Sequence, residues 1–73
     1  MASIDDKKFL RELGERVRTQ RLARGWSQQQ FADKAVLHRT FIGSVERGEG
    51  NISILNLRLL ARVLRVPLAE LLG

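Results

Sequence analysis

The segment 38–47 can place short polar side chains on one side of a helix. At about 100° per residue, that side holds Thr40, Gly43, Ser44 and Arg47, with Arg39 at its border. An arginine offers a planar fork of hydrogen-bond donors, and a hydroxyl can donate or accept. Groups of these kinds recognise anions and hydrogen-bonding edges.

Each polar residue of this face has a candidate role at a nucleic acid and a simpler alternative. Arg39 could hold the O6 and N7 atoms of guanine with two hydrogen bonds, or remain a solvated surface side chain. Thr40 and Ser44 could contact a base edge or a thymine methyl group, or only a phosphate. Gly43 would let the helix sit close to the bases. The alternative is a tolerated glycine, which costs a helix about 1 kcal/mol relative to alanine.

Further residues could bond phosphates on either side of that face. Arg47 and Asn51 could clamp one phosphate at the end of the segment. His38 begins the segment, where its ring could bond a phosphate or cap the helix. Arg18 is a weaker phosphate candidate, and a solvated surface charge is its alternative role.

The composition favours a polyanion as the partner. The chain has 73 residues, with 13 Lys and Arg against 8 Asp and Glu, which gives a net charge of +5 and a pI near 11.1. A small domain this basic is typical of proteins that bind nucleic acid. We expect residues 1–73 to form a single domain. No apolar run approaches the roughly 18 residues that a membrane span needs, so no membrane partner is expected.

Enzymatic and metal chemistry is disfavoured by the residue types present. The chain has no cysteine and one histidine, so neither a disulfide nor a histidine–cysteine metal site is expected. The sequence contains no Ser/His/Asp set, no glycine-rich phosphate loop and no carboxylate pair with a plausible pocket. We therefore expect no enzyme activity, no metal and no cofactor.

Helix signals divide the chain into short pieces. Gly25 is placed to end the first helix, and Ser27 with Gln30 forms a capping box. Ser53 is a good N-cap, and Pro67 suits the first position of a final helix. No stretch alternates apolar and polar residues over the length of a strand. The sequence therefore predicts an all-α fold of five helices at about 5–24, 27–35, 38–47, 54–65 and 67–72.

The predicted helix 54–65 carries apolar residues on two opposite sides. One stripe, expected to face the core, consists of Ile54, Leu57, Leu60, Ala61 and Leu64. The second stripe consists of Leu55, Leu59, Val63 and Val66. A chain this small cannot bury both sides by itself, so we expect a homodimer through the last two helices. The alternative is that the final helix folds back over the second stripe.

The combined pattern resembles a known family of small regulators. The residues that carry the resemblance are Arg16-Val17-Arg18, Gly25-Trp26-Ser27-Gln28, Ile42-Gly43-Ser44-Val45-Glu46-Arg47-Gly48 and the tail from Asn56 to Leu72. Over about residues 13–72 the chain is similar to Cro/repressor-type (XRE-type) helix-turn-helix transcriptional regulators. Arg39-Thr40-Phe41-Ile42 and Asn51-Ile52-Ser53 are similar to the controller proteins of restriction–modification systems. Gln20, Phe31 and Phe41 depart from the family's usual residues.

The resemblance implies a regulator, activating or repressing, that binds a double-stranded DNA operator with its third helix in the major groove. It implies a homodimer on a pseudo-palindromic site. It also implies a phosphate contact for Gln28, with ordinary capping as the alternative, and a structural ion pair between Arg21 and Glu46. RNA polymerase is a candidate second partner, and the expected location is the nucleoid in the cytoplasm of a bacterium, with a bacterial or phage gene.

A function of a different class stays open at this point. An antitoxin-type module would use the same domain to bind a partner protein, with DNA binding for autoregulation. Such a module would be expected to carry an extra tail for its partner, and only Gly73 follows the predicted last helix.

Overall fold

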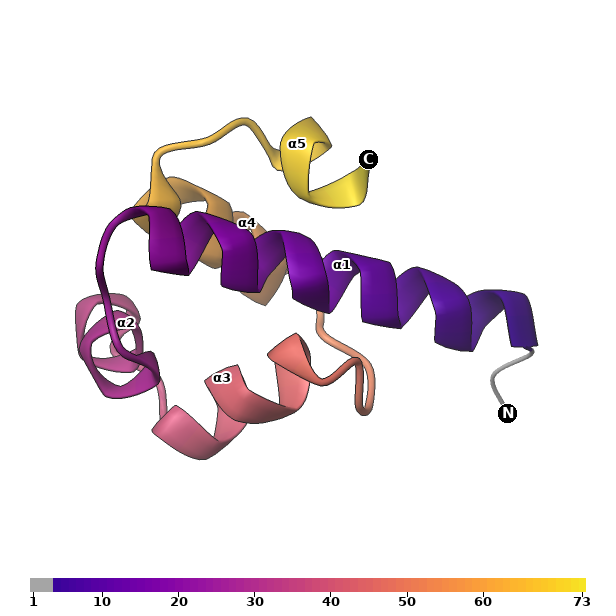
Figure 1. Cartoon of the computed structure of the whole chain (residues 1–73), viewed down its shortest axis with the longest axis horizontal. Coiled ribbons are helices and arrows are strands. Elements are labelled where there is room, and N and C mark those ends of the chain that lie inside the picture. Colours follow the sequence, from indigo (N-terminus) through magenta and orange to yellow (C-terminus); the bar gives the residue numbers. More distant parts are fainter. Residues whose placement is uncertain (1–3) are drawn as a thin grey trace.

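The computed structural model describes residues 4–73, with side chains from residue 6 onward. Its elements are α1 (Ile4–Ala23), α2 (Gln28–Ala35), α3 (Arg39–Glu46), α4 (Ile54–Leu64) and α5 (Leu68–Leu72) (Figure 1). Residues 4–73 contain no strand. The predicted all-α fold of five helices is therefore confirmed, and each boundary lies within one residue of its predicted position.

The helix ends follow the local signals in the sequence. The Ser27 hydroxyl accepts a hydrogen bond from the Gln30 backbone N–H at 3.0 Å, and Gln30 Oε1 accepts one from the Ser27 backbone N–H at 2.8 Å. Ser53 Oγ accepts the Asn56 N–H at 3.1 Å, at the start of α4. Pro67 precedes α5 as its N-cap instead of taking the first helical position.

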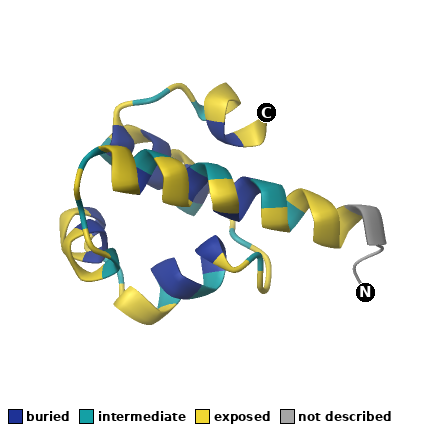
Figure 2. Ribbon diagram, in the orientation of Figure 1, coloured by how far each residue is buried: buried dark blue, intermediate teal, exposed yellow. Residues whose placement is uncertain are grey.

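The long helix α1 runs through the middle of the molecule. In the view of Figure 1, α3 lies on one side of α1 and α5 on the other, and α4 packs against α1, α2 and α5. Each helix turns one side inward, as the buried residues in Figure 2 show. The core consists of Leu13, Val17, Phe31, Ala32, Ala35, Ile42, Val45, Leu57, Leu60, Ala61, Leu64 and Leu71.

Gly14 sets the distance between α1 and α3. A Cβ atom at residue 14 would lie 2.4 Å from the carbonyl oxygen of Val45 and 2.6 Å from that of Glu46. These neighbours are backbone atoms of α3, which cannot move aside as the end of a side chain can. The absence of a side chain at Gly14 therefore lets the backbones of the two helices touch.

Two residues that are not glycine adopt the left-handed backbone conformation. Val36 (φ 55°) caps the C-terminus of α2, and Arg65 (φ 59°) caps that of α4. A residue with a Cβ atom is strained there by about 1–2 kcal/mol, and glycine is the usual residue at such a cap. A glycine would therefore relieve strain at either position.

The apolar residues of α4 differ in part from the predicted stripes. Ile54, expected in the core, is 58% exposed because it is the first helical residue and lies at the edge of the packed region. Of the second stripe, Val63 and Val66 pack against the core, Leu59 is half-buried and Leu55 is 68% exposed. The second stripe is therefore open to solvent mainly at its N-terminal end. No helix among residues 4–73 is both long and apolar enough to cross a membrane.

Candidate nucleic-acid interface

The outer face of α3 begins with two exposed residues, Arg39 and Thr40. No ion pair involves Arg39 within the described part of the chain, so its donors are available to an incoming acceptor. Ser44, one turn further along, is half-buried, and its hydroxyl donates a 3.1 Å hydrogen bond to the carbonyl of Phe41. Ser44 could therefore meet a base as an acceptor without breaking an internal bond.

Gly43 is buried, although it was expected on the open face. A Cβ atom at residue 43 would lie 3.1 Å from Arg47 Nη1 and 3.7 Å from Gln28 Oε1. The side chains of Gln28 and Arg47 thus lie across this position. The missing side chain makes room for two predicted phosphate-binding residues, and the direct approach of Gly43 to a base is not open in this arrangement.

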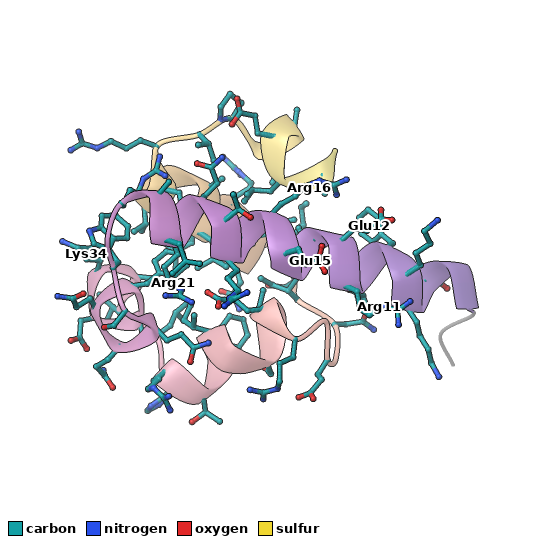
Figure 3. All side chains as sticks on the ribbon, viewed as in Figure 1. Arg11, Glu12, Glu15, Arg16, Arg21 and Lys34 are labelled. Atoms are coloured by element: carbon teal, nitrogen blue, oxygen red, sulfur yellow. The ribbon has the colours of Figure 1, made fainter. Side chains whose placement is uncertain are left out.

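A buried ion pair ties α3 to α1. Arg21 donates from Nε to Glu46 Oε2 at 2.7 Å and from Nη2 to Glu46 Oε1 at 2.9 Å. Its third bond, from Nη1, goes to the carbonyl of Trp26 at 2.7 Å. Figure 3 shows the Arg21 side chain on the inner side of α1. The structure therefore joins α1, the turn before α2 and the last residue of α3 through one guanidinium group.

The pair is almost closed to water, with Arg21 7% and Glu46 8% exposed. The hydrogen bonds to Glu46, more than its charge at a distance, raise the pKa of Arg21 above its ordinary value, against the lowering effect of burial. Two parallel bonds to one carboxylate also fix the orientation of both side chains. Arg21 and Glu46 can thus orient α3 without touching a ligand themselves.

Gln28 joins this network from the first position of α2. Its amide nitrogen Nε2 donates to Glu46 Oε1 at 3.2 Å. The capping bonds of α2 are made by Ser27 and Gln30, so capping is not the role of the Gln28 side chain. One of its two amide hydrogens remains for an outside acceptor, such as a phosphate oxygen.

At the other end of α3, Arg47 and Asn51 are both exposed. Arg47 Nη2 lies 3.1 Å from Glu49 Oε1, and the hydrogen bond to Glu49 raises the pKa of Arg47. A hollow of about 430 Å³ lies beside them, and its lining also includes Lys7 and Arg11 of α1. Lys7 and Arg11 were not predicted as site residues, although their i, i+4 spacing indicates that they share one face of a helix.

Contact between α1 and the turn after α3 brings these cations together. A Cβ atom at Gly48 would lie 2.8 Å from the Cα atom of Arg11, and Gly48 has a φ of 74°. Arg18 and His38 are exposed elsewhere, and neither lines this hollow. His38 is the N-cap of α3 by position, but its side chain makes no capping hydrogen bond. The cap alternative for its ring is thus not realised.

The described residues contain no group of three or more histidine, cysteine, aspartate or glutamate side chains that could hold a metal ion. The surface built by α2, α3 and the turn after it is instead one of exposed arginines, hydroxyls and amides. Its arrangement is a short helix, a tight turn and a second helix whose outer side stays open. Such an arrangement can enter a groove of duplex DNA and bond its phosphates at the flanks.

The helix-turn-helix family profile matches residues 17–71, so the chain belongs to the helix-turn-helix family and is a DNA-binding regulator of that class. Among curated proteins, it is similar to control protein C.SmaI of Serratia marcescens, with 45% identity over 60 residues that cover 82% of this chain and 71% of that protein. It is also similar to control protein C.BamHI of Bacillus amyloliquefaciens, with 38% identity over 60 residues that cover 81% and 74%.

A solved structure gives the same relationship. The restriction–modification controller protein C.AhdI of Aeromonas hydrophila superposes with a TM-score of 0.81 at 40% identity, covering 85% of this chain and 94% of that one. The predicted resemblance to controller proteins is therefore confirmed. These relatives are regulators, in agreement with the prediction that the chain is not an enzyme.

Proposed function

We propose that this protein is a sequence-specific transcription regulator of the restriction–modification controller type, which binds a pseudo-palindromic DNA operator as a homodimer. The observation that carries the proposal is the exposed face at the start of α3, where Arg39 and Thr40 lie in solvent. The opposite side of this helix is fixed to α1 by the buried ion pair between Arg21 and Glu46. The first turn of the second helix is the part that reaches base edges when such a motif enters the major groove.

Phosphate contacts would set the position of α3 in the groove. Gln28 lies at the N-terminus of α2, and Arg47 and Asn51 lie beyond the C-terminus of α3, so the two groups flank the reading face. Lys7 and Arg11 extend the second group. Contacts of this kind supply most of the affinity and its salt dependence, whereas Arg39, Thr40 and Ser44 would supply the sequence preference.

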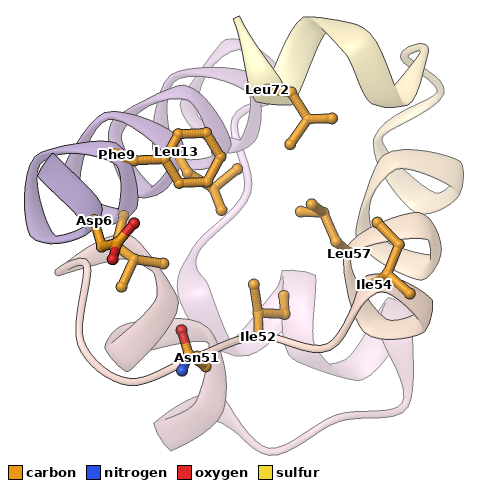
Figure 4. Close-up of a pocket in the computed structure, with 9 residues that line it drawn as sticks. Asp6, Phe9, Leu13, Asn51, Ile52, Ile54, Leu57 and Leu72 are labelled. Atoms are coloured by element: carbon orange, nitrogen blue, oxygen red, sulfur yellow. The ribbon is translucent and has the colours of Figure 1, made fainter. Parts of the chain in front are cut away.

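The surface for a second copy is an apolar hollow of about 570 Å³ between α1, the segment before α4 and the end of α5 (Figure 4). Phe9, Ile54 and Leu72 line it with their side chains partly in solvent, and the exposed Leu55 follows Ile54 directly. Exposed apolar residues that gather in one region mark a protein interface. We place the dimer interface here, which keeps Leu55 of the predicted stripe and moves the interface away from Leu59, Val63 and Val66.

A two-fold dimer would present two copies of α3 to the same side of a duplex. Half-sites that lie one helical turn apart need reading helices separated by about 34 Å. The test is selection of bound duplexes from a random pool. We expect inverted repeats whose centres are about 10 base pairs apart, or a multiple of that. A pool that stays random after selection at low salt would overturn the proposal, as would a single unrepeated site.

A further inference from the structure

Four basic side chains surround a further hollow, on a part of the surface to which α3 contributes no residue. This basic hollow has a volume of about 520 Å³ and is lined by Arg24, Trp26, Lys34, Arg62, Val63 and Arg65. It lies where α1, α2 and α4 end, and Figure 3 shows Lys34 at the outer edge of α2. The DNA-reading face does not account for these cations.

The positive charge of the basic hollow is not neutralised within the protein. Among the described residues, no carboxylate forms an ion pair with any of its four cations. The guanidinium of Arg24 is held by neutral acceptors alone: the Gln20 carbonyl at 2.8 Å, Gln20 Oε1 at 2.9 Å and the carbonyl of Leu64. Arg24 is therefore a cation that is fixed in position by acceptors without a counter-charge.

Helix ends explain only part of this charge. The C-terminus of a helix carries about half a negative charge, so the three helix ends here supply roughly −1.5 in total. The four side chains supply one positive charge each. An excess of about 2.5 positive charges thus remains without a partner, which is more than the stabilisation of helix ends requires.

The neighbours of Trp26 disfavour a nucleotide base in the basic hollow. Lys34 Nζ lies 4.9 Å from the centroid of the Trp26 ring, and the ring of Phe31 lies 6.0 Å away at a tilt of 31°. Lys34 therefore lies over the Trp26 ring, where a stacked base would lie. Val63 adds an apolar contact next to the arginines, which a phosphodiester backbone would not use.

The backbone at Arg65 gives an independent reason to assign a role to its side chain. Arg65 occupies the left-handed region at φ 59°, where glycine would be less strained. A strained residue at an exposed position is a basis for a functional hypothesis. Here it places a charged side chain directly at the rim of the basic hollow.

We propose that the basic hollow docks an acidic segment of a partner protein, with carboxylates bound by Arg24, Arg62 and Arg65 and an apolar side chain packed on Val63. Guanidinium groups pair with carboxylates through two parallel hydrogen bonds, so the contact is specific in its geometry as well as in its charge. Because α3 takes no part in it, the hollow can be occupied while α3 is bound to DNA.

The chain offers a direct reporter of occupancy, because Trp26 is its one tryptophan. A short synthetic peptide with glutamates on both sides of a central leucine pair is titrated into the full protein while Trp26 fluorescence is followed. Arg62→Gln removes a cation of the hollow. Arg58→Gln removes the same charge from the same helix, one turn away and outside the lining, and is the matched control.

We expect a saturable change in Trp26 fluorescence, with affinity reduced about tenfold by Arg62→Gln and unchanged by Arg58→Gln. Arg65→Gly should weaken peptide binding to a similar extent and leave the fold intact, since glycine suits that backbone conformation. Equal affinities for Arg62→Gln and Arg58→Gln would show general charge attraction and overturn the proposal. A loss of duplex DNA affinity specific to Arg62→Gln would instead assign the hollow to DNA, and would also overturn it. The selection of operator sequences uses the unmodified protein, so the proposed DNA-binding function is tested separately from this docking proposal.

Discussion

The Gln28 amide nitrogen and the Glu46 carboxylate meet at 3.2 Å, and the oxygen that joins them, Oε1, also accepts a bond from Arg21 Nη2. A residue predicted to bond phosphate and a residue predicted to hold the fold are therefore parts of one network. Removing Glu46 would release both of its partners at once. Hydrogen bonds within such a network depend on each other, so their effects are not additive.

Glu46→Ala should lower the free energy of unfolding by about 3–5 kcal/mol, because it leaves Arg21 buried without a counter-charge. A domain of this size has little more stability than that, so partial unfolding at 37 °C is expected. Denaturant unfolding of the two proteins measures the difference. The selected DNA sequence should stay the same wherever the variant is folded. A new consensus at an unchanged melting temperature would contradict the structural role.

The double variant Arg21→Met/Glu46→Leu is the control for that experiment. It removes both charges, and replacing a buried pair by apolar residues is often neutral or stabilising. It should therefore recover much of the stability that Glu46→Ala loses.

The pH dependence of stability adds a further check on the Arg21–Glu46 pair. The raised pKa of Arg21 means that its share of stability is fully present below the pKa of an arginine in the unfolded chain, and is lost only as pH rises through the higher folded value.

Arg39→Ala should reduce the affinity for a selected duplex by about 1–3 kcal/mol and relax the preference at one base position of each half-site. Binding to random DNA should change much less. Titration of cognate and scrambled duplexes at matched salt separates the two effects. Equal losses on both duplexes would make Arg39 a phosphate contact.

Glu49→Gln should strengthen binding to every duplex by a few-fold. The change frees Arg47 from its 3.1 Å pair with Glu49, and both residues are exposed and close to the predicted phosphate clamp. We expect the dependence of affinity on salt to steepen by about one counterion. Glu12→Gln, which removes a half-buried carboxylate on α1 that pairs with Lys8 and Arg16, is the matched control and should affect binding less. Identical results for the two variants would mean that net charge alone governs the change.

Leu55→Asp should convert the proposed dimer to monomers, because it introduces a charge into the apolar interface at a position that is 68% exposed in the single chain. Association should weaken by about two orders of magnitude or more. Leu22→Asp is the control, since Leu22 is 51% exposed on α1 outside the apolar hollow. Light scattering reports the mass of each variant. A dimer mass for Leu55→Asp would exclude this interface.

Gly14→Ala and Gly43→Ala should act in opposite directions, although both glycines are buried within helices. The new Cβ atom at residue 14 meets the Val45 carbonyl oxygen at 2.4 Å and must push α3 away, so thermal unfolding should shift strongly downward. At residue 43 it meets the movable end of Arg47, and alanine favours the helix by up to about 1 kcal/mol. A stable Gly14→Ala variant would contradict the close crossing of α1 and α3.

Local signals were enough to predict the helices and their order. The Ser27 capping box, the Ser53 cap and the apolar spacing along α1 act within a few residues of the chain, so a sequence carries them directly. The predicted face of α3 also places Thr40 and Arg39 in solvent. The burial of Gly43 could not be predicted in the same way, because one of the two side chains that cover it, Gln28, comes from a different helix.

Tertiary packing decided the features that the sequence left open. Periodicity assigned Ile54 to the core and Val63 to an open stripe, but Ile54 is 58% exposed at the edge of α4, whereas Val63 is partly buried and packs against the core. Lys7 and Arg11 join the predicted phosphate clamp only because Gly48 rests against α1. Contacts between segments more than thirty residues apart leave no periodic trace in a single sequence.

The crossing at Gly14 has a mechanical consequence for how the molecule meets its target. Because the backbone of α1 contacts the backbone of α3 directly, no side chains lie between them whose rotamer changes could let α3 tilt or slide. We therefore expect α3 to keep its orientation relative to α1 when the protein binds DNA. Binding to a non-ideal operator would then require the duplex to bend or the angle between the two subunits to change.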